Sequence, residues 1–249
     1  MSQVNLTLKT AARATKVDPG LDLRTLPRMP QQAAFSPEPP IVHRNRHFAT
    51  DPELHPAQLF EPIINGSLSP APRWVYRDPV GFAVLIFTDG SAPYNGMPSV
   101  RAGCGVVFRP DGVGSLSFPL ERVPGYDLTS NRAELRAAHA ALQFRHWGAE
   151  GFKKIVIGTD SEYMVRGMCE YCFKWKQNGW KTSNDEPVKN RDLWEMLIDE
   201  VERWEGEGIH VAFYLLKRAW NIDADACAKA GADQPNIPDQ FQRWVGAGL

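Results

Sequence analysis

Two short apolar runs, each closed by the dipeptide Thr-Asp, constrain the fold of this chain more than any other feature. The first is FAVLIFTD, with an expected strand over Phe82–Thr88, and the second is KIVIGTD, with an expected strand over Lys154–Thr159. Neither run alternates apolar with polar residues, and such continuous runs are typical of strands buried on both faces. A sheet buried on both faces needs helices above and below it, so the runs predict an α/β fold.

The segments around these runs supply the other elements. The turn residues Pro110-Asp-Gly separate two short apolar segments, which predicts a meander of strands. Apolar residues recur at helical spacing in later segments, and Gly148 ends the first of these helices. We expect a mixed five-stranded sheet, a three-strand antiparallel meander plus two further strands, with helices on both faces. The remaining strands are expected over 103–108, 115–120 and 210–216, and the helices over 131–147, 161–172, 192–204 and from about 222.

Proline is concentrated near the start of the chain. Eleven of the 20 prolines lie in residues 1–72, where periodic apolar patterning is absent. We therefore predict a mostly extended, poorly ordered segment over 1–72, a folded domain over 73–233 and a C-terminal tail over 234–249.

Charge and apolar patterning exclude some classes of function. The formal net charge is -1, so any binding of nucleic acid must come from a local basic patch. No apolar run approaches the roughly 20 residues of a membrane helix, so no membrane association is expected. The chain start lacks a secretory signal and the four cysteines are scattered, which favours an intracellular protein, cytoplasmic or nuclear. A mitochondrial transit peptide is the alternative, because residues 1–17 are acid-free and carry Lys9, Arg13 and Lys16.

An aspartate follows each of the two strand runs. Asp89 and Asp160 directly follow the C-terminal ends of apolar strands, where a carboxylate loses part of its hydration. If the two strands are adjacent, the two carboxylates repel each other unless a cation lies between them. Each aspartate alone can be explained as a cap of the turn that follows. Together, two hard oxygen ligands favour a magnesium site.

Further acids lie in the expected helices. Glu134 is a third candidate ligand, although the pattern Asn131-x-x-Glu134 also fits a helix capping box. Asp223 and Asp225 are two residues apart in the last helix and cannot share one face. The residues themselves do not choose between these two.

Five segments together resemble a known family. FTDGSAPYNG, TSNRAELRAA, GTDSEYMVRG, NGWKTSNDEPVKNRDLW and WNIDADACA are similar in order and spacing to cellular type 1 ribonuclease H. The resemblance covers about Val75 to Ala232. It implies an RNase H-like fold of the kind predicted above, with the meander strands first.

The resemblance also implies a reaction. The four carboxylates of the family fall on Asp89, Glu134, Asp160 and, through the pattern N-x-x-A-D, Asp225. Such a set can hold two Mg²⁺ ions roughly 3.5–4 Å apart for in-line displacement at phosphorus, with Mn²⁺ as a substitute and Asp89 as the bridging ligand. The implied activity is endonucleolytic hydrolysis of the RNA strand of RNA–DNA hybrids, which leaves 5′-phosphate and 3′-hydroxyl ends. A monomer without a small-molecule cofactor is expected.

Contacts to both strands of the hybrid are implied as well. They comprise polar contacts in the minor groove that sense the 2′-hydroxyl, a pocket for a DNA-strand phosphate, and a basic protrusion. The minor-groove contacts fall on Asn95, Ser130 and Asn131, and the phosphate pocket falls on Thr129 and Asn190. The residues of the basic protrusion are Trp175, Lys176, Trp180 and Lys181. Two alternatives come from the residues themselves, because an asparagine before a helix is a good N-cap and tryptophans pack between helices.

Two positions depart from the family pattern. Asp127 stands where the family often has an arginine of the phosphate pocket, and its charge repels a phosphate. The segment LLKRAWN replaces a loop that carries a histidine in relatives, and Lys217 and Arg218 are the nearest substitutes. His139 does not replace it, because it lies on an apolar helix face. The alternative reading is therefore a weakly active or inactive RNase H-like protein that binds hybrids or a protein partner.

Overall fold

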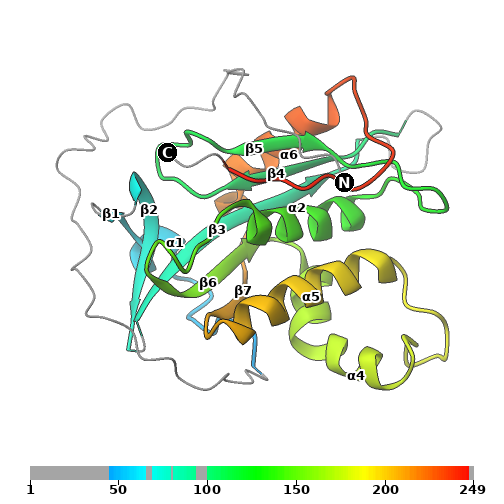
Figure 1. Ribbon diagram of the computed structural model, residues 1–249, viewed down its shortest axis with the longest axis horizontal. Coiled ribbons are helices and arrows are strands. Elements are labelled where there is room, and N and C mark those ends of the chain that lie inside the picture. Colours follow the sequence, from blue (N-terminus) through cyan, green and yellow to red (C-terminus); the bar gives the residue numbers. More distant parts are fainter. Residues whose placement is uncertain (1–44, 66–68, 80, 94–99, 247–249) are drawn as a thin grey trace.

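A single mixed sheet forms the centre of the protein (Figure 1). The computed structural model describes residues 45–65, 69–79, 81–93 and 100–246. The central strand β3 pairs antiparallel with β2 along its first half and with β4 along its second half, and it pairs in parallel with β6. The strands are β1 (Glu61–Asn65), β2 (Ser69–Asp78), β3 (Gly81–Ser91), β4 (Gly103–Val107), β5 (Leu116–Pro119), β6 (Phe152–Thr159) and β7 (His210–Leu215).

The predicted α/β class is confirmed. The meander is β3, β4 and β5, and the two further strands are β6 and β7, which run parallel to each other. No helix in the described part of the chain is both long and apolar enough to cross a membrane. The helices are α1 (Pro56–Leu59), α2 (Ser130–Phe144), α3 (Glu162–Arg166), α4 (Cys172–Gln177), α5 (Arg191–Gly206) and α6 (Ile222–Ala232), with a π-helical turn over Gly167–Tyr171 and a 3₁₀ turn over Arg218–Trp220.

Helices cover both faces of the sheet, as the sequence predicts. Successive residues of a strand point to opposite faces, and β4 shows this directly. The thiol of Cys104 donates a hydrogen bond to the carbonyl of Ala133 in α2. Its neighbours Gly103 and Gly105 face α6 so closely that a Cβ on either would lie 2.0 or 2.1 Å from the helix backbone. Figure 1 shows α2, with α5 and α4 beyond it, on one side of the strands and α6 on the other.

The sheet is larger than the five strands predicted, because β1 and β2 precede the meander. Both strands lie wholly or partly in the segment 1–72 that we expected to be poorly ordered, so that expectation is wrong for its last part. The prediction was wrong because it used the proline content of the whole segment and did not consider the position of each proline. Pro56 begins α1, where its missing N–H is harmless, and Pro62 lies in β1, an edge strand, where proline is tolerated.

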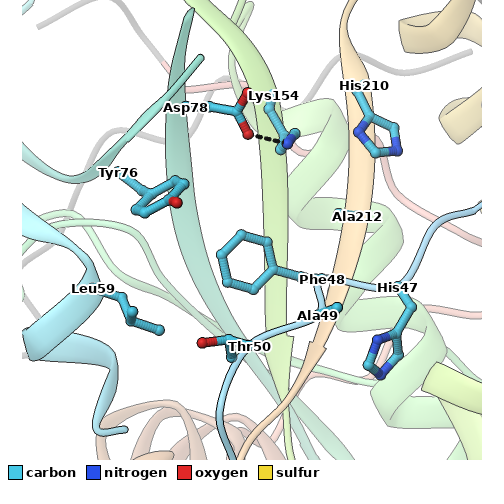
Figure 2. A pocket seen from close by; sticks show the side chains of 10 residues that line it. All are labelled: His47, Phe48, Ala49, Thr50, Leu59, Tyr76, Asp78, Lys154, His210 and Ala212. Carbon is cyan, nitrogen blue, oxygen red and sulfur yellow. Dashed lines mark hydrogen bonds and ion pairs between the residues drawn. The ribbon is translucent and has the colours of Figure 1, made fainter. Parts of the chain in front are cut away.

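Residues 45–60 cover part of the sheet face opposite α2. His47 forms a parallel bridge with Phe213 of β7, and Phe48 and Phe60 pack in an apolar cluster on that face. Figure 2 shows Phe48 between Tyr76 and Ala212, at a pocket of about 180 Å³. The described N-terminal residues therefore belong to the core rather than to a loose extension.

The C-terminal tail also packs against the domain. Trp244 packs against Phe118 of β5 with ring centroids 4.5 Å apart, and the amide of Gly246 donates to the carbonyl of Phe144 at the end of α2. These contacts extend the folded unit beyond residue 233, the predicted boundary. Residues 1–44 of the predicted N-terminal segment and 247–249 of the tail lie outside the described residues.

Candidate active site

The strand register brings the two strand-end aspartates to one end of the sheet. Phe87 of β3 pairs in parallel with Gly158 of β6. Asp89 and Asp160 follow these two partners by two residues each, so they leave neighbouring parallel strands side by side. This meets the expectation that the carboxyl ends of adjacent strands bring the acids together.

Two glycine contacts bring the helical acids to the same place. Gly90, next to Asp89, lies so close to α2 that a Cβ on it would be 2.1 Å from the backbone nitrogen of Glu134. On the other face, Asp89 pairs across the strands with Gly105, whose Cβ would lie 2.1 Å from the carbonyl oxygen of Ala224 in α6. Asp225 is the next residue of that helix. Glycine is needed at both strand positions because any side chain would push a helix away from the acids.

The electrostatics of Asp89 show that the four acids act on one another. Its side chain is 7% exposed, and its pKa is raised to about 7, first by burial and then by the negative charge of Asp160. Asp225 and Glu134 raise this pKa further, while a backbone hydrogen bond from Gly90 lowers it. Mutual repulsion of this kind favours a bound cation.

The pKa of Glu134 is raised too. Burial is the largest cause and the charge of Asp160 adds to it, whereas Ser161 and Arg218 act in the opposite direction. Arg218 is therefore a cation close enough to the acids to influence them. It is one of the two substitutes that the sequence offered for the missing loop histidine.

Side-chain donors from the described residues contact three of the four acids. The hydroxyl of Ser161 donates to Glu134, the side-chain amide of Asn221 donates to Asp160 over 2.8 Å, and the ammonium of Lys229 pairs with Asp225 over 2.6 Å. With the acids in these orientations, no group of three or more acid, histidine or cysteine side chains in the described residues is arranged to hold a metal ion.

The donor set nevertheless fits a hard divalent cation. Four carboxylates supply the oxygen ligands that Mg²⁺ prefers. Two buried oxygens beside them, Oγ1 of Thr88 and Oδ1 of Asn221, have no hydrogen-bond partner within the described residues. The site therefore contains oxygens that could accept a ligand, and its four carboxylates carry more negative charge than the neighbouring cations balance.

Replacing Asp89 tests the crowding of the acids without any activity assay. A carboxyl whose folded pKa lies above its unfolded value contributes stability that is present below about pH 4 and lost as the pH rises through about 7. In chelator, Asp89→Asn should therefore have a higher free energy of unfolding than the wild type at pH 8, by on the order of a few kcal/mol. Urea unfolding at pH 5 to 8 measures this difference, which should shrink toward pH 5.

The exposed Asp223 supplies the control for that prediction. Asp223→Asn leaves the four acids in place, so it should not reproduce the gain in the free energy of unfolding that is expected of Asp89→Asn at pH 8. A difference for Asp89→Asn that does not vary with pH would contradict the repulsion among the four acids.

Asn221 and Ser161 are site residues to which the sequence assigned no role. Asn221 is buried, and its side-chain amide bridges Asp160 and the carbonyl of Thr88. Ser161 also accepts a hydrogen bond from the backbone of Met164 and so begins α3. The asparagine of the N-x-x-A-D pattern was the only signal for either residue, and it was used to align Asp225.

Thr129 and Asn190, for which the sequence predicted a phosphate pocket, precede α2 and α5, and the side chain of Arg132 contacts Asn190. Thr129 caps α2, accepting from the amide of Arg132, and Asn190 precedes α5 in the left-handed conformation, with φ at 59°. The capping box through Asn131 and Glu134 is wrong, since Thr129 is the cap. Asn190 occupies the N-cap position of α5, as the alternative expected, but its side chain forms no capping bond and instead contacts Arg132 and Tyr163.

The sequence indicated that an acid, Asp127, replaces an arginine of the predicted phosphate pocket, and no free arginine is found there among the described residues that contact Asn190. Asp127 is exposed, and the guanidinium of Arg132, which contacts Asn190, forms a bidentate pair with Asp192 over 2.7 and 2.8 Å. Arg132 is therefore neutralised and does not replace the missing arginine.

The tryptophans near the predicted protrusion pack mainly against one another. Trp194 is fully buried, as predicted, and Trp175 contacts both Trp194 and Trp180, with ring centroids 5.2 and 6.2 Å apart. Trp180 is 8% exposed. Packing therefore accounts for most of the surface of these rings, while the half-buried Trp175 keeps part of its ring at the surface.

The predicted basic residues of this region have internal partners. Lys176 pairs with Glu202 over 2.7 Å, and Lys181 pairs with Asp185 over 2.8 Å. Ser130 is half-buried and Asn131 exposed at the first turn of α2, close to Glu134. Asn95 lies outside the described residues.

The pocket of Figure 2 lies elsewhere. It includes Lys154 at the start of β6, whereas Asp160 follows the end of that strand. Six residues separate the two, or about 20 Å at the strand rise of about 3.3 Å per residue. We place the candidate active site at the acids, because charges of one sign gather there and raise the pKa of Asp89 and of Glu134.

The residues from β3 to the end of α6 are similar to known proteins. A family model described as RNase H matches residues 82–233. The ribonuclease H of Actinobacillus pleuropneumoniae serotype 5b (strain L20) is 38% identical over 157 residues, which are 63% of this chain and 94% of that protein. The ribonuclease HI of Pasteurella multocida (strain Pm70) is 35% identical over 161 residues, with 63% and 94% covered. A solved structure described as LC9-RNase H1, a type 1 RNase H with the type 2 active-site motif, is 28% identical, with 60% of this chain and 72% of that chain covered at a TM-score of 0.44.

Proposed function

The chain belongs to the type 1 ribonuclease H family, and we propose that it cleaves the RNA strand of RNA–DNA hybrids as an endonuclease, leaving 5′-phosphate and 3′-hydroxyl ends. The observation that carries this proposal is the convergence of Asp89, Glu134, Asp160 and Asp225, seen in the raised pKa of Asp89. Members of this family generally depend on divalent metal ions.

The four acids are the residues that would hold such ions. We propose two Mg²⁺ ions, with Mn²⁺ as a substitute, because four carboxylates carry enough negative charge to balance two divalent cations. Bound there, they supply Lewis-acid stabilisation of the charge that develops on the phosphate and a more acidic water as the nucleophile.

The other residues of the site orient these acids. Asn221 holds Asp160 against the end of β3, and Ser161 holds Glu134 from the start of α3. Arg218 is exposed and acts on Glu134, so it is placed to attract a phosphate group at the edge of the acids. These contacts give the acids defined positions, which a reaction controlled by geometry requires.

Substrate contacts are proposed at two places. Ser130 and Asn131 lie at the first turn of α2, one turn from Glu134, and can reach the minor groove next to the scissile strand. Around α4, the exposed Lys174, Lys176 and Lys189 would meet the phosphates of the DNA strand. Because Lys176 is partly neutralised by Glu202, we expect binding to be moderate and sensitive to salt.

A cleavage assay on three matched duplexes, with either strand of the hybrid labelled, tests the proposal. The RNA strand of a labelled hybrid should be cut with Mg²⁺ or Mn²⁺ present, with 5′-phosphate on the newly formed ends, and cutting should stop in chelator. Duplex DNA, duplex RNA and the DNA strand of the hybrid should stay intact. Binding of the hybrid without any RNA cutting at high protein concentration would instead support a binding protein, the reading favoured by the missing loop histidine.

A further inference from the structure

We propose that Arg46, in the segment that precedes the family domain, is a positioning residue that sets the charge of the hybrid-binding surface around α4. The matched family region begins at residue 82, so nothing in the family assigns a role to this segment. The inference rests on the proposed binding of hybrids by that surface.

The backbone fixes Arg46 firmly. Its carbonyl accepts a hydrogen bond of 2.7 Å from the amide of Phe213 in β7, and the amide of Phe48 donates to the carbonyl of Phe213 over 2.9 Å. Farther along the segment, the carbonyl of Leu54 accepts from the hydroxyl of Tyr214. The segment is therefore held on β7 at Arg46 itself and at residues that follow it.

The side chain of Arg46 reaches from β7 to two helices. It is 2% exposed and forms a bidentate pair with Glu205 of α5, with nitrogen–oxygen distances of 2.9 and 2.8 Å. The same guanidinium donates to the sulfur of Cys172 over 3.5 Å and lies 4.9 Å from the ring centre of Phe173. Both of these residues begin α4, the helix that carries Lys174 and Lys176.

A shared carboxylate connects Arg46 with Lys176. Glu202 lies 4.0 Å from the guanidinium of Arg46 and pairs with the ammonium of Lys176 over 2.7 Å. Two carboxylates, Glu202 and Glu205, thus face two cations. Arg46 forms a bidentate ion pair with Glu205 and a weaker, longer one with Glu202. The share of the Glu202 charge that Arg46 neutralises sets how strongly Glu202 attracts Lys176, and so how freely Lys176 can bind a nucleic-acid phosphate.

Two substitutions should shift that balance in opposite directions. Arg46→Met leaves Glu202 to Lys176 alone, so the ammonium is held more tightly and the KM for the hybrid should rise about tenfold. Glu205→Gln lets Arg46 turn to Glu202, which releases Lys176, so the KM should fall by about two- to threefold. In both variants kcat should stay within about twofold, because neither residue touches the acids.

Arg73→Met is the matched control. Arg73 is 1% exposed and forms a similar buried pair with Glu150, with nitrogen–oxygen distances of 2.9 and 3.2 Å, away from α4. It should lower the free energy of unfolding by a similar amount to Arg46→Met without changing the KM. If Arg46→Met does not fold, Glu205→Gln against the control decides the question.

Measuring affinity and cleavage separately distinguishes a failure of this inference from a failure of the proposed function. Affinities are measured at fixed salt by fluorescence anisotropy of a labelled hybrid in chelator, alongside steady-state cleavage with Mg²⁺. Failure of the wild type to cleave would overturn the proposed function and leave the affinity test in place. Equal shifts in Arg46→Met and Arg73→Met, or shifts of the same sign in Arg46→Met and Glu205→Gln, would overturn the inference.

Discussion

Asp160→Asn is expected to lower the rate of hybrid cleavage by at least about 10³-fold while the affinity for the hybrid changes by less than about threefold. Asp160 is proposed as a ligand at the centre of the acids, and its charge adds to the raised pKa of both Asp89 and Glu134. Loss of one ligand charge removes several kcal/mol of stabilisation of the developing charge on phosphorus, and each 1.4 kcal/mol corresponds to about a tenfold change in rate.

Affinity should persist because asparagine keeps the shape of the side chain. The amide group of the variant can turn its oxygen toward Asn221, so the hydrogen bond that now spans 2.8 Å can be retained. Single-turnover cleavage and a binding titration in chelator separate the two quantities. Wild-type cleavage in Asp160→Asn would mean that the ions are held elsewhere.

Helix α6 provides a matched pair of variants for the same experiment. Asp225 is half-buried and Asp223 is exposed, although both lie in the first turn of α6. Asp225→Asn should lose activity to a similar extent as Asp160→Asn, and Asp223→Asn should keep it. Equal losses in both variants of α6 would indicate a general effect of charge on that helix rather than a ligand at position 225.

Arg136→Met is expected to lower the free energy of unfolding by about 3–5 kcal/mol. Arg136 and Glu121 form an ion pair with both side chains 0% exposed, and a nitrogen–oxygen distance of 2.7 Å. The guanidinium also donates to the backbone carbonyl of Gln242, which ties the C-terminal tail to α2. Removing the arginine leaves the Glu121 carboxylate buried without its partner, which costs far more than the packing of a similar apolar side chain returns.

Two further variants make that prediction specific to the buried charge. Glu121→Leu combined with Arg136→Met removes both charges and should recover most of the lost stability. Arg191→Ala breaks an exposed pair with Glu195 and should change the free energy of unfolding by less than about 0.5 kcal/mol. Urea unfolding with an unchanged slope is the measurement for all three. A loss below 1 kcal/mol in Arg136→Met would show that the pair contributes little.

The sequence predicted most of the sheet and the place of the acids. Continuous apolar runs are short-range patterns, and the two that end in Thr-Asp correctly predicted β3 and β6 with Asp89 and Asp160 at their ends. The wider motifs added Glu134 and Asp225. Whether these acids bind ions is still a prediction, because only their convergence is visible.

Long-range packing decided the rest. The proline-rich composition hid β1, the first strand of the sheet, because composition does not record which prolines lie on an edge strand. The tryptophans could not be assigned from spacing, since Trp175 meets Trp194 only after α4 and α5 have packed. In the same way, the pattern Asn131-x-x-Glu134 fitted a capping box, but Ser161 from another helix takes the carboxylate of Glu134.

By itself, the sequence determined the fold class and the family, and it predicted the four acids, because those depend on local patterns and on motifs in a fixed order. Only the tertiary structure decided which charges remain available to a substrate. Arg46 and Glu205 are 159 residues apart, and Lys176 and Glu202 are 26 apart, so no local pattern links them. Electrostatic energy depends on distance in space and on burial, and the folded chain alone sets both.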